Sequence, residues 1–172
     1  PNHLDFSLLP LSPALQSGNI NGKSVDMGSS IHLTDADPFP IISHLFVNPG
    51  NSSFPEFIGI HNPSEKNIDM SNFTISKGFE FTFPEGTILG KGGFLYITSD
   101  AGSFAWYNFI SPVLQWSGGQ LSNSGEEIEL KENHGLVVDY LSYNDHSSWP
   151  SEAFSNGKVM VIKNSAFDNH FG

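Results

Sequence analysis

The chain of 172 residues contains no cysteine and no arginine. Without cysteine it forms no disulfide, no thiolate zinc site and no cysteine nucleophile. Its seven lysines stand against 18 carboxylates, which gives a formal net charge of −11 at pH 7. Nucleic-acid backbones and anionic membrane surfaces are bound by clustered cations, and two-pronged recognition of phosphate favours arginine. We therefore expect no nucleic-acid partner, and we interpret the acidity as that of a solvated surface.

Long apolar runs and helical periodicity are also scarce. No apolar stretch approaches the roughly 20 residues of a membrane-spanning helix, so we expect no insertion into a membrane. One short helix is predicted over residues 101–108, with Asp100 as its N-terminal cap and with Phe104 and Tyr107 three residues apart.

Aromatic side chains and turn residues are abundant instead. Phenylalanine occurs 15 times, and 17 glycines and 11 prolines are spread along the chain. Turn residues at such intervals punctuate short strands, and aromatic rings fill a core efficiently. The sequence therefore predicts an all-β, immunoglobulin-like β-sandwich of about seven to nine strands. The predicted strands cover residues 41–47, 56–61, 73–76, 79–83, 94–98, 113–116, 126–131, 136–143 and 158–163.

Residues 1–40 are predicted to form an arm before the sandwich, which occupies residues 41–172. We expect the arm to pack on the sandwich or on a neighbouring chain. Edge strands expose unpaired N–H and C=O groups, so the apolar segment 4–9 is a candidate donor strand for a neighbour's sheet. Its predicted contact residues are Leu4, Phe6 and Leu8.

Candidate metal ligands are sparse. Asp35 and Asp37 lie one residue apart, so both carboxylates can offer oxygens on the same side of an extended loop to a calcium ion. Turn capping before Pro38 explains the same pair. None of the seven histidines has another histidine at a metal-ligand spacing, so a zinc site would have to join residues from distant strands.

Three tryptophans, Trp106, Trp116 and Trp149, are candidates for ligand contact. If the indole faces of Trp116 and Trp149 are exposed, they could stack on sugar rings, which makes glycan binding an alternative function. Packing in the core or at its rim is the other interpretation, because aromatic side chains dominate cores.

Catalytic signatures do not occur. The chain has no Gly-x-Ser-x-Gly phrase, no phosphate-binding loop and no dinucleotide fingerprint, so we expect neither an enzyme nor a cofactor site. Glu127 and Glu129 alternate on a predicted strand and so share one face. That face is either solvated or hydrogen-bonded to a neighbouring loop, or it forms a paired-carboxylate active site, which would also need a cleft and a matched partner.

Four strand-and-turn phrases follow one another between residues 41 and 150. They are EFIGIHNP at 56–63, IDMSNFTI at 68–75, FTFPEGTI at 81–88 and NSGEEIEL at 123–130. In this order and spacing they resemble the lamin tail domain family, whose fold is an immunoglobulin-like β-sandwich. One departure is Phe73, which stands where the family usually has tryptophan.

The resemblance is nearer to the bacterial branch of that family, where such domains occur on exported and surface proteins, often beside hydrolases or nucleases. It implies a non-catalytic, secreted or cell-surface module for adhesion or assembly, which contacts protein partners or further copies of itself. Two alternatives remain open at this point. One is a carbohydrate-binding module, assisted by calcium or not; the other is an accessory targeting domain of a larger extracellular hydrolase or nuclease.

Overall fold

The structure is a computed structural model, and it describes residues 18–20, 23–25, 39–50, 54–107, 112–146, 149–155 and 157–161. The chain divides into two compact units, Pro1–Asp37 and Pro38–Gly172. In the first unit, β1 (Gly18–Ile20) and β2 (Lys23–Val25) form an antiparallel pair. The predicted contacts of residues 4–9 lie outside the described residues, so the packing of the arm stays a prediction.

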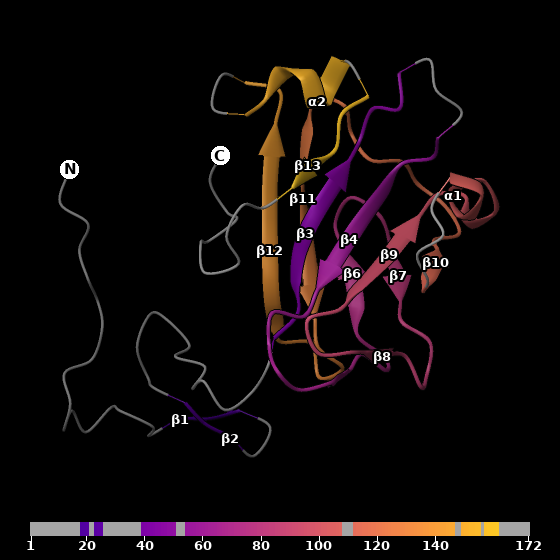
Figure 1. Cartoon of the computed structure of the whole chain (residues 1–172). Coiled ribbons are helices and arrows are strands. Elements are labelled where there is room, and N and C mark those ends of the chain that lie inside the picture. Colours follow the sequence, from indigo (N-terminus) through magenta and orange to yellow (C-terminus); the bar gives the residue numbers. More distant parts are fainter. Residues whose placement is uncertain are drawn as a thin grey trace, which may run out of the picture. The chain divides into compact units, whose positions relative to one another are not determined.

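The second unit contains a five-stranded sheet with the strand order β10-β9-β4-β3-β13 (Figure 1). β10 runs parallel to β9, and the other neighbours are antiparallel. The strands are β3 (Ile41–Phe46), β4 (Phe57–His61), β9 (Phe94–Thr98), β10 (Val113–Gln115) and β13 (Met160–Val161).

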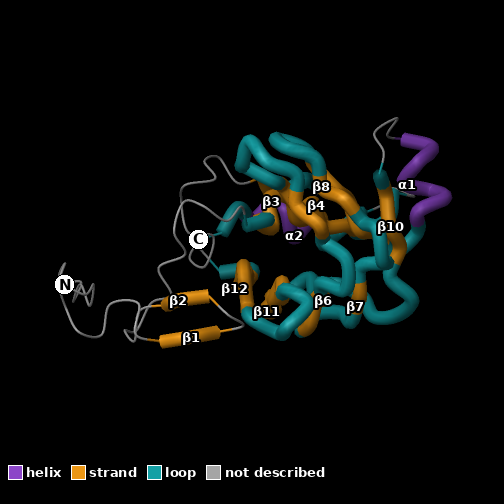
Figure 2. The backbone as a smooth tube through the Cα atoms, turned by 90° about the horizontal axis from the view of Figure 1, so that it is seen from below, coloured by secondary structure: helices purple, strands orange, loops and turns teal. Residues whose placement is uncertain are grey.

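A four-stranded antiparallel sheet with the order β12-β11-β6-β7 forms a second layer, which Figure 2 shows separately from the first. Its strands are β6 (Thr74–Ser76), β7 (Phe81–Thr82), β11 (Gly125–Lys131) and β12 (Val137–Asn144). A short antiparallel pair is made by β5 (Ile68–Asp69) and β8 (Ile88–Leu89). Two packed sheets confirm the predicted all-β sandwich.

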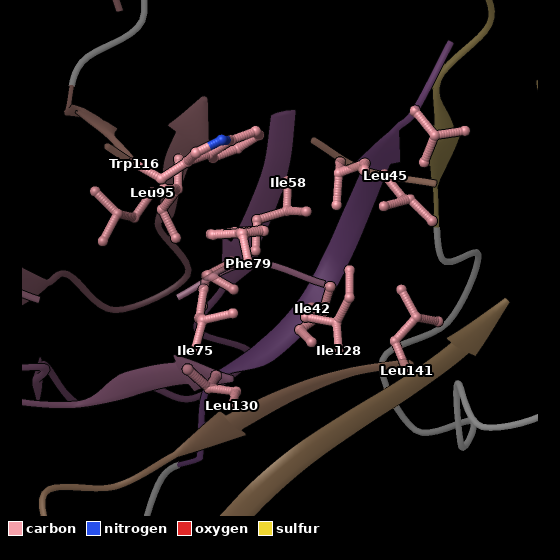
Figure 3. Packing of buried hydrophobic residues seen from close by; sticks show 14 of the residues in the cluster. Ile42, Leu45, Ile58, Ile75, Phe79, Leu95, Trp116, Ile128, Leu130 and Leu141 are labelled. Carbon is pink, nitrogen blue, oxygen red and sulfur yellow. The ribbon is translucent and has the colours of Figure 1, made fainter. Parts of the chain in front are cut away.

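The core lies between the two sheets (Figure 3). Side chains alternate along a strand, so Ile58 and Ile60 of β4 are buried in the core while Phe57 and Gly59 belong to the opposite face, as the sequence predicts. The fully buried aliphatic residues of the opposing sheet are Ile75, Ile128 and Leu130.

A side-chain hydrogen bond joins the two sheets. A register shift between Ile42 and His44 marks a β-bulge in β3. There the main-chain N–H of Ile42 donates to Asp139 Oδ2 on β12, at 2.6 Å. A strand of the first sheet is thereby tied to the edge strand of the second.

Two short helices complete the unit. Helix α1 (Ala101–Tyr107) is capped as predicted, because the N–H of Ser103 donates to Asp100 Oδ1 at 3.1 Å. Helix α2 (Ser151–Ser155) was not predicted; it buries Ala153 and Phe154 in the core. Within the described residues, no helix has the length and apolar character needed to cross a membrane.

Candidate functional site

The outer face of the five-stranded sheet carries a layer of aromatic rings. The register places His61 of β4 opposite Phe94 of β9, and it places Gly59 between His44 of β3 and Tyr96 of β9. The rings of His61 and Phe94 are stacked, with centroids 4.3 Å apart and planes inclined by 18°. His44 meets Phe94 and Tyr96 edge-on, at 5.4 and 5.7 Å between centroids. We call His44, His61, Phe94 and Tyr96 the histidine–aromatic face.

Gly59 makes room for this arrangement. A Cβ atom at position 59 would lie 2.9 Å from His44 Cβ, 3.0 Å from His44 Nδ1 and 3.0 Å from Tyr96 Cε1. Those distances are shorter than ordinary van der Waals contact. The imidazole of His44 therefore lies over the backbone of β4, in space that a side chain would otherwise fill.

Hydrogen bonds fix the tautomers of both imidazoles. The Ser43 hydroxyl donates to the Gly59 carbonyl at 3.1 Å, so its oxygen accepts from His44 Nδ1–H at 2.9 Å. His61 Nδ1 lies 3.1 Å from the Gly93 carbonyl oxygen, which can only accept, so this nitrogen also carries hydrogen. Burial, together with repulsion from His61, lowers the pKa of His44. In the neutral form of either ring the lone pair is therefore on Nε2.

The two ends of this outer face differ in exposure. At one end Phe46, Phe57 and Phe104 form a second buried cluster, and Phe104 comes from helix α1. At the other end the side chain of Phe94 is 38% exposed, and Val161 of β13 is exposed as well. The end bearing the two histidines is therefore the accessible one.

The outer face of the four-stranded sheet is charged. Lys77 Nζ lies 2.7 Å from Glu127 Oε2 and 2.9 Å from Glu129 Oε1, and Lys131 Nζ lies 2.7 Å from Glu129 Oε2. Hydrogen bonds from the two lysines lower the pKa of Glu129 to about 2. A general acid needs a pKa raised towards neutrality, so this cluster favours the hydrogen-bonded face over the paired-carboxylate active site.

A second carboxylate pair, Glu56 and Glu126, holds the segment before β11. Glu56 Oε2 accepts from the N–H of Leu121 at 3.0 Å, and Glu126 Oε1 accepts from the N–H of Ser122 at 2.8 Å. The Tyr143 hydroxyl lies 2.6 Å from the same Glu126 oxygen. Burial, with repulsion from Glu126, raises the pKa of Glu56, and burial raises that of Tyr143. One oxygen of each carboxylate accepts from a main-chain N–H, which is typical of a structural network.

Strand β12 lies at one edge of the four-stranded sheet. It is eight residues long and, among the described strands, it is hydrogen-bonded along its length only to β11. Val137, at its start, is 40% exposed. The strand contains no proline and no lysine, which are the residues that commonly protect an edge.

The predicted ligand-contact residues have different surroundings. Trp116 is only 3% exposed; it stacks on Phe79 at 4.2 Å between centroids and donates its indole N–H to the Gly119 carbonyl. It therefore offers no ring face to a sugar in this conformation. Trp149 is partly buried against the core.

The remaining predicted sites, Asp35, Asp37, Leu4, Phe6 and Leu8, lie outside the described residues, as does the side chain of Trp106. Within the described part of the chain, no three His, Asp or Glu side chains are grouped so that they could hold a metal ion.

Sequence reasoning missed that His44 and His61 share one face, where both rings contact Phe94. These residues are far apart in the chain, and they share this face because β3 and β4 are neighbours with a bulge at Ser43. The alternating pattern of residues 56–61 places His61 on the face of Gly59, but only the strand register adds His44.

Comparison with known families gives one result. The family model of the Lamin Tail Domain matches residues 36–145. That match includes β3 to β12 and stops before α2 and β13. A search of the curated proteins finds no match.

Proposed function

Because the chain belongs to the lamin tail domain family, we propose that it acts as a non-catalytic protein-interaction module, in adhesion or assembly at the cell surface or after secretion. The observation that carries this proposal is the position of β12 at the edge of its sheet, among the described strands. The immunoglobulin-like sandwich supports it, because such domains present sheet edges and loops to their partners on a rigid scaffold.

Strand addition is the mode of contact that suits β12. An incoming strand gains main-chain hydrogen bonds along an edge, and alternate side-chain positions provide specificity. The only charged residue of β12, Asp139, accepts a hydrogen bond from β3. A neighbour's segment 4–9 is the donor that we propose, because Leu4, Phe6 and Leu8 alternate as a half-buried strand requires.

Light scattering over a range of protein concentrations tests this assembly. We expect the full chain to form dimers or larger species, and the chain without residues 1–15 to be monomeric. A variant carrying Val137→Lys and Ser142→Lys should also be monomeric, because edge lysines oppose strand pairing. Ile88→Lys is the matched control, because Ile88 is 50% exposed on a different strand pair. Identical monomers for the full and the shortened chain would overturn the proposal.

A further inference from the structure

His44 and His61 are arranged like two histidines of one strand. The imidazole of His44 lies over Gly59, and His61 is two residues further along the same strand β4. Side chains two residues apart on a strand point to the same face, about 6.6 Å apart along the strand at 3.3 Å per residue. A His-x-His arrangement of this kind can direct two ring nitrogens at one ion.

We propose that His44 and His61 bind a divalent transition-metal ion, with Zn²⁺ as the reference case, through their Nε2 atoms. Imidazole nitrogen suits Zn²⁺, Ni²⁺ and Cu²⁺, whereas Ca²⁺ and Mg²⁺ take oxygen ligands.

The hydrogen bonds prepare both rings for this role. A metal-bound histidine almost always donates its other ring N–H to a carbonyl, a carboxylate or water, which fixes the tautomer and the ring orientation. Ser43 Oγ accepts from His44 Nδ1–H, and the Gly93 carbonyl accepts from His61 Nδ1–H. In each neutral ring the lone pair that a metal needs is therefore on Nε2.

The strand neighbours of the two imidazoles carry no positive charge. No lysine lies opposite either histidine in the strand register. The residues at those positions are Ile41, Gly59, Phe94 and Val161. The net charge of −11 attracts cations to the molecule as a whole.

Among the described residues the site has two protein ligands, so it is open. Structural zinc sites have four protein ligands, whereas this face supplies two imidazoles and leaves the other coordination positions to water. We expect exchangeable binding that is weaker than in a closed structural site. The site differs from the proposed interaction edge, because His44 and His61 are on the five-stranded sheet and β12 is on the other.

Titration of the ¹⁵N-histidine-labelled full chain with ZnCl₂, followed by residue-assigned imidazole NMR, tests the proposal. We expect saturable shifts of the Nε2 resonances of His44 and His61 at one ion per chain, with those of the exposed His134 and His146 unchanged. His61→Phe, which keeps an aromatic ring to stack on Phe94, should weaken Zn²⁺ binding at least tenfold. Ser43→Ala should weaken it about tenfold, as expected when an outer partner of a ligand is removed.

Controls make the result decisive. His134→Ala and His146→Ala should leave the Zn²⁺ affinity unchanged, and the thermal unfolding midpoint of each variant shows whether it is folded. Acidification should abolish binding, because an imidazolium has no lone pair on Nε2. Shifts confined to other histidines, or an unchanged affinity in folded His61→Phe, would overturn the proposal.

Discussion

The ring of Phe154 stacks on the ring of Tyr143, with 6.1 Å between centroids and 15° between planes. Tyr143 belongs to β12, inside the residues that match the family, and Phe154 belongs to α2, beyond them. The main-chain carbonyl of Phe154 also accepts from the side-chain amide of Asn48, after β3. The folded unit therefore extends past the matched residues, because α2 contributes to the same core.

Phe154→Ala should lower the free energy of unfolding by about 3 kcal/mol, the lower end for removing a buried phenylalanine. The large side chain is buried among core residues, so its loss leaves a cavity. Urea unfolding measures the effect. Glu152→Ala in the same helix is the control, because Glu152 is exposed and its loss should change stability by less than about 0.5 kcal/mol. Equal effects of the two substitutions would contradict the assignment of α2 to the core.

Asn62→Ala should destabilise the fold by about 2 to 3 kcal/mol, because it leaves buried carbonyl groups without their donor. The side-chain amide of Asn62 is fully buried and lies within hydrogen-bond distance of the carbonyls of Lys66, Leu89 and Gly90. Thermal unfolding would show the loss. Asn123→Ala, at an exposed turn position, serves as comparison and should leave the midpoint nearly unchanged.

Glu56→Gln should stabilise the protein at pH 7. The folded-state pKa of Glu56 is raised above its usual value of 4.5, chiefly by burial, so the ionised group costs stability above the folded pKa. That cost disappears as the pH falls through the raised folded value towards 4.5. The variant should therefore have a higher free energy of unfolding than the parent at neutral pH. Below the usual pKa of 4.5 the two should be equally stable. Unfolding free energies measured from pH 3 to pH 8 would test this, and a variant less stable than the parent at pH 7 would contradict it.

Gly59→Ala should destabilise the fold by about 1 to 3 kcal/mol, the usual range for overpacking. The added methyl group would force His44 and Tyr96 apart. The same substitution should reduce the Zn²⁺ affinity if His44 must lie over the backbone. Gly118→Ala is the matched control, because a Cβ there meets nothing within 4 Å. Chemical denaturation of both variants compares the two positions directly.

The sequence predicted the strands whose own residues alternate between apolar and polar or are followed by turn residues. Residues 57–61 alternate, and the turn that ends their strand contains Asn62 and Pro63. It did not predict β5 and β8, which have two residues each, or α2, which has five. Segments that short have no readable periodicity and form because the rest of the sandwich holds them.

The candidate site was less predictable than the fold, because it depends on contacts between strands. His44 and His61 share a face only through the register of β3 with β4, and the bulge at Ser43 decides which face His44 occupies. Trp116 shows the same dependence. The sequence leaves both exposure and core packing open for its ring, which the structure stacks on Phe79 in the core.

The contact between Asp139 and Ile42 has a consequence for how the sandwich opens. Neighbouring strands within a sheet are joined by several main-chain bonds, whereas at this point the two sheets are joined by a carboxylate. The amide hydrogen of Ile42 is therefore shielded by an acceptor that can be protonated. Its rate of exchange with deuterated solvent reports the separation of the two layers, independently of the unfolding of either one.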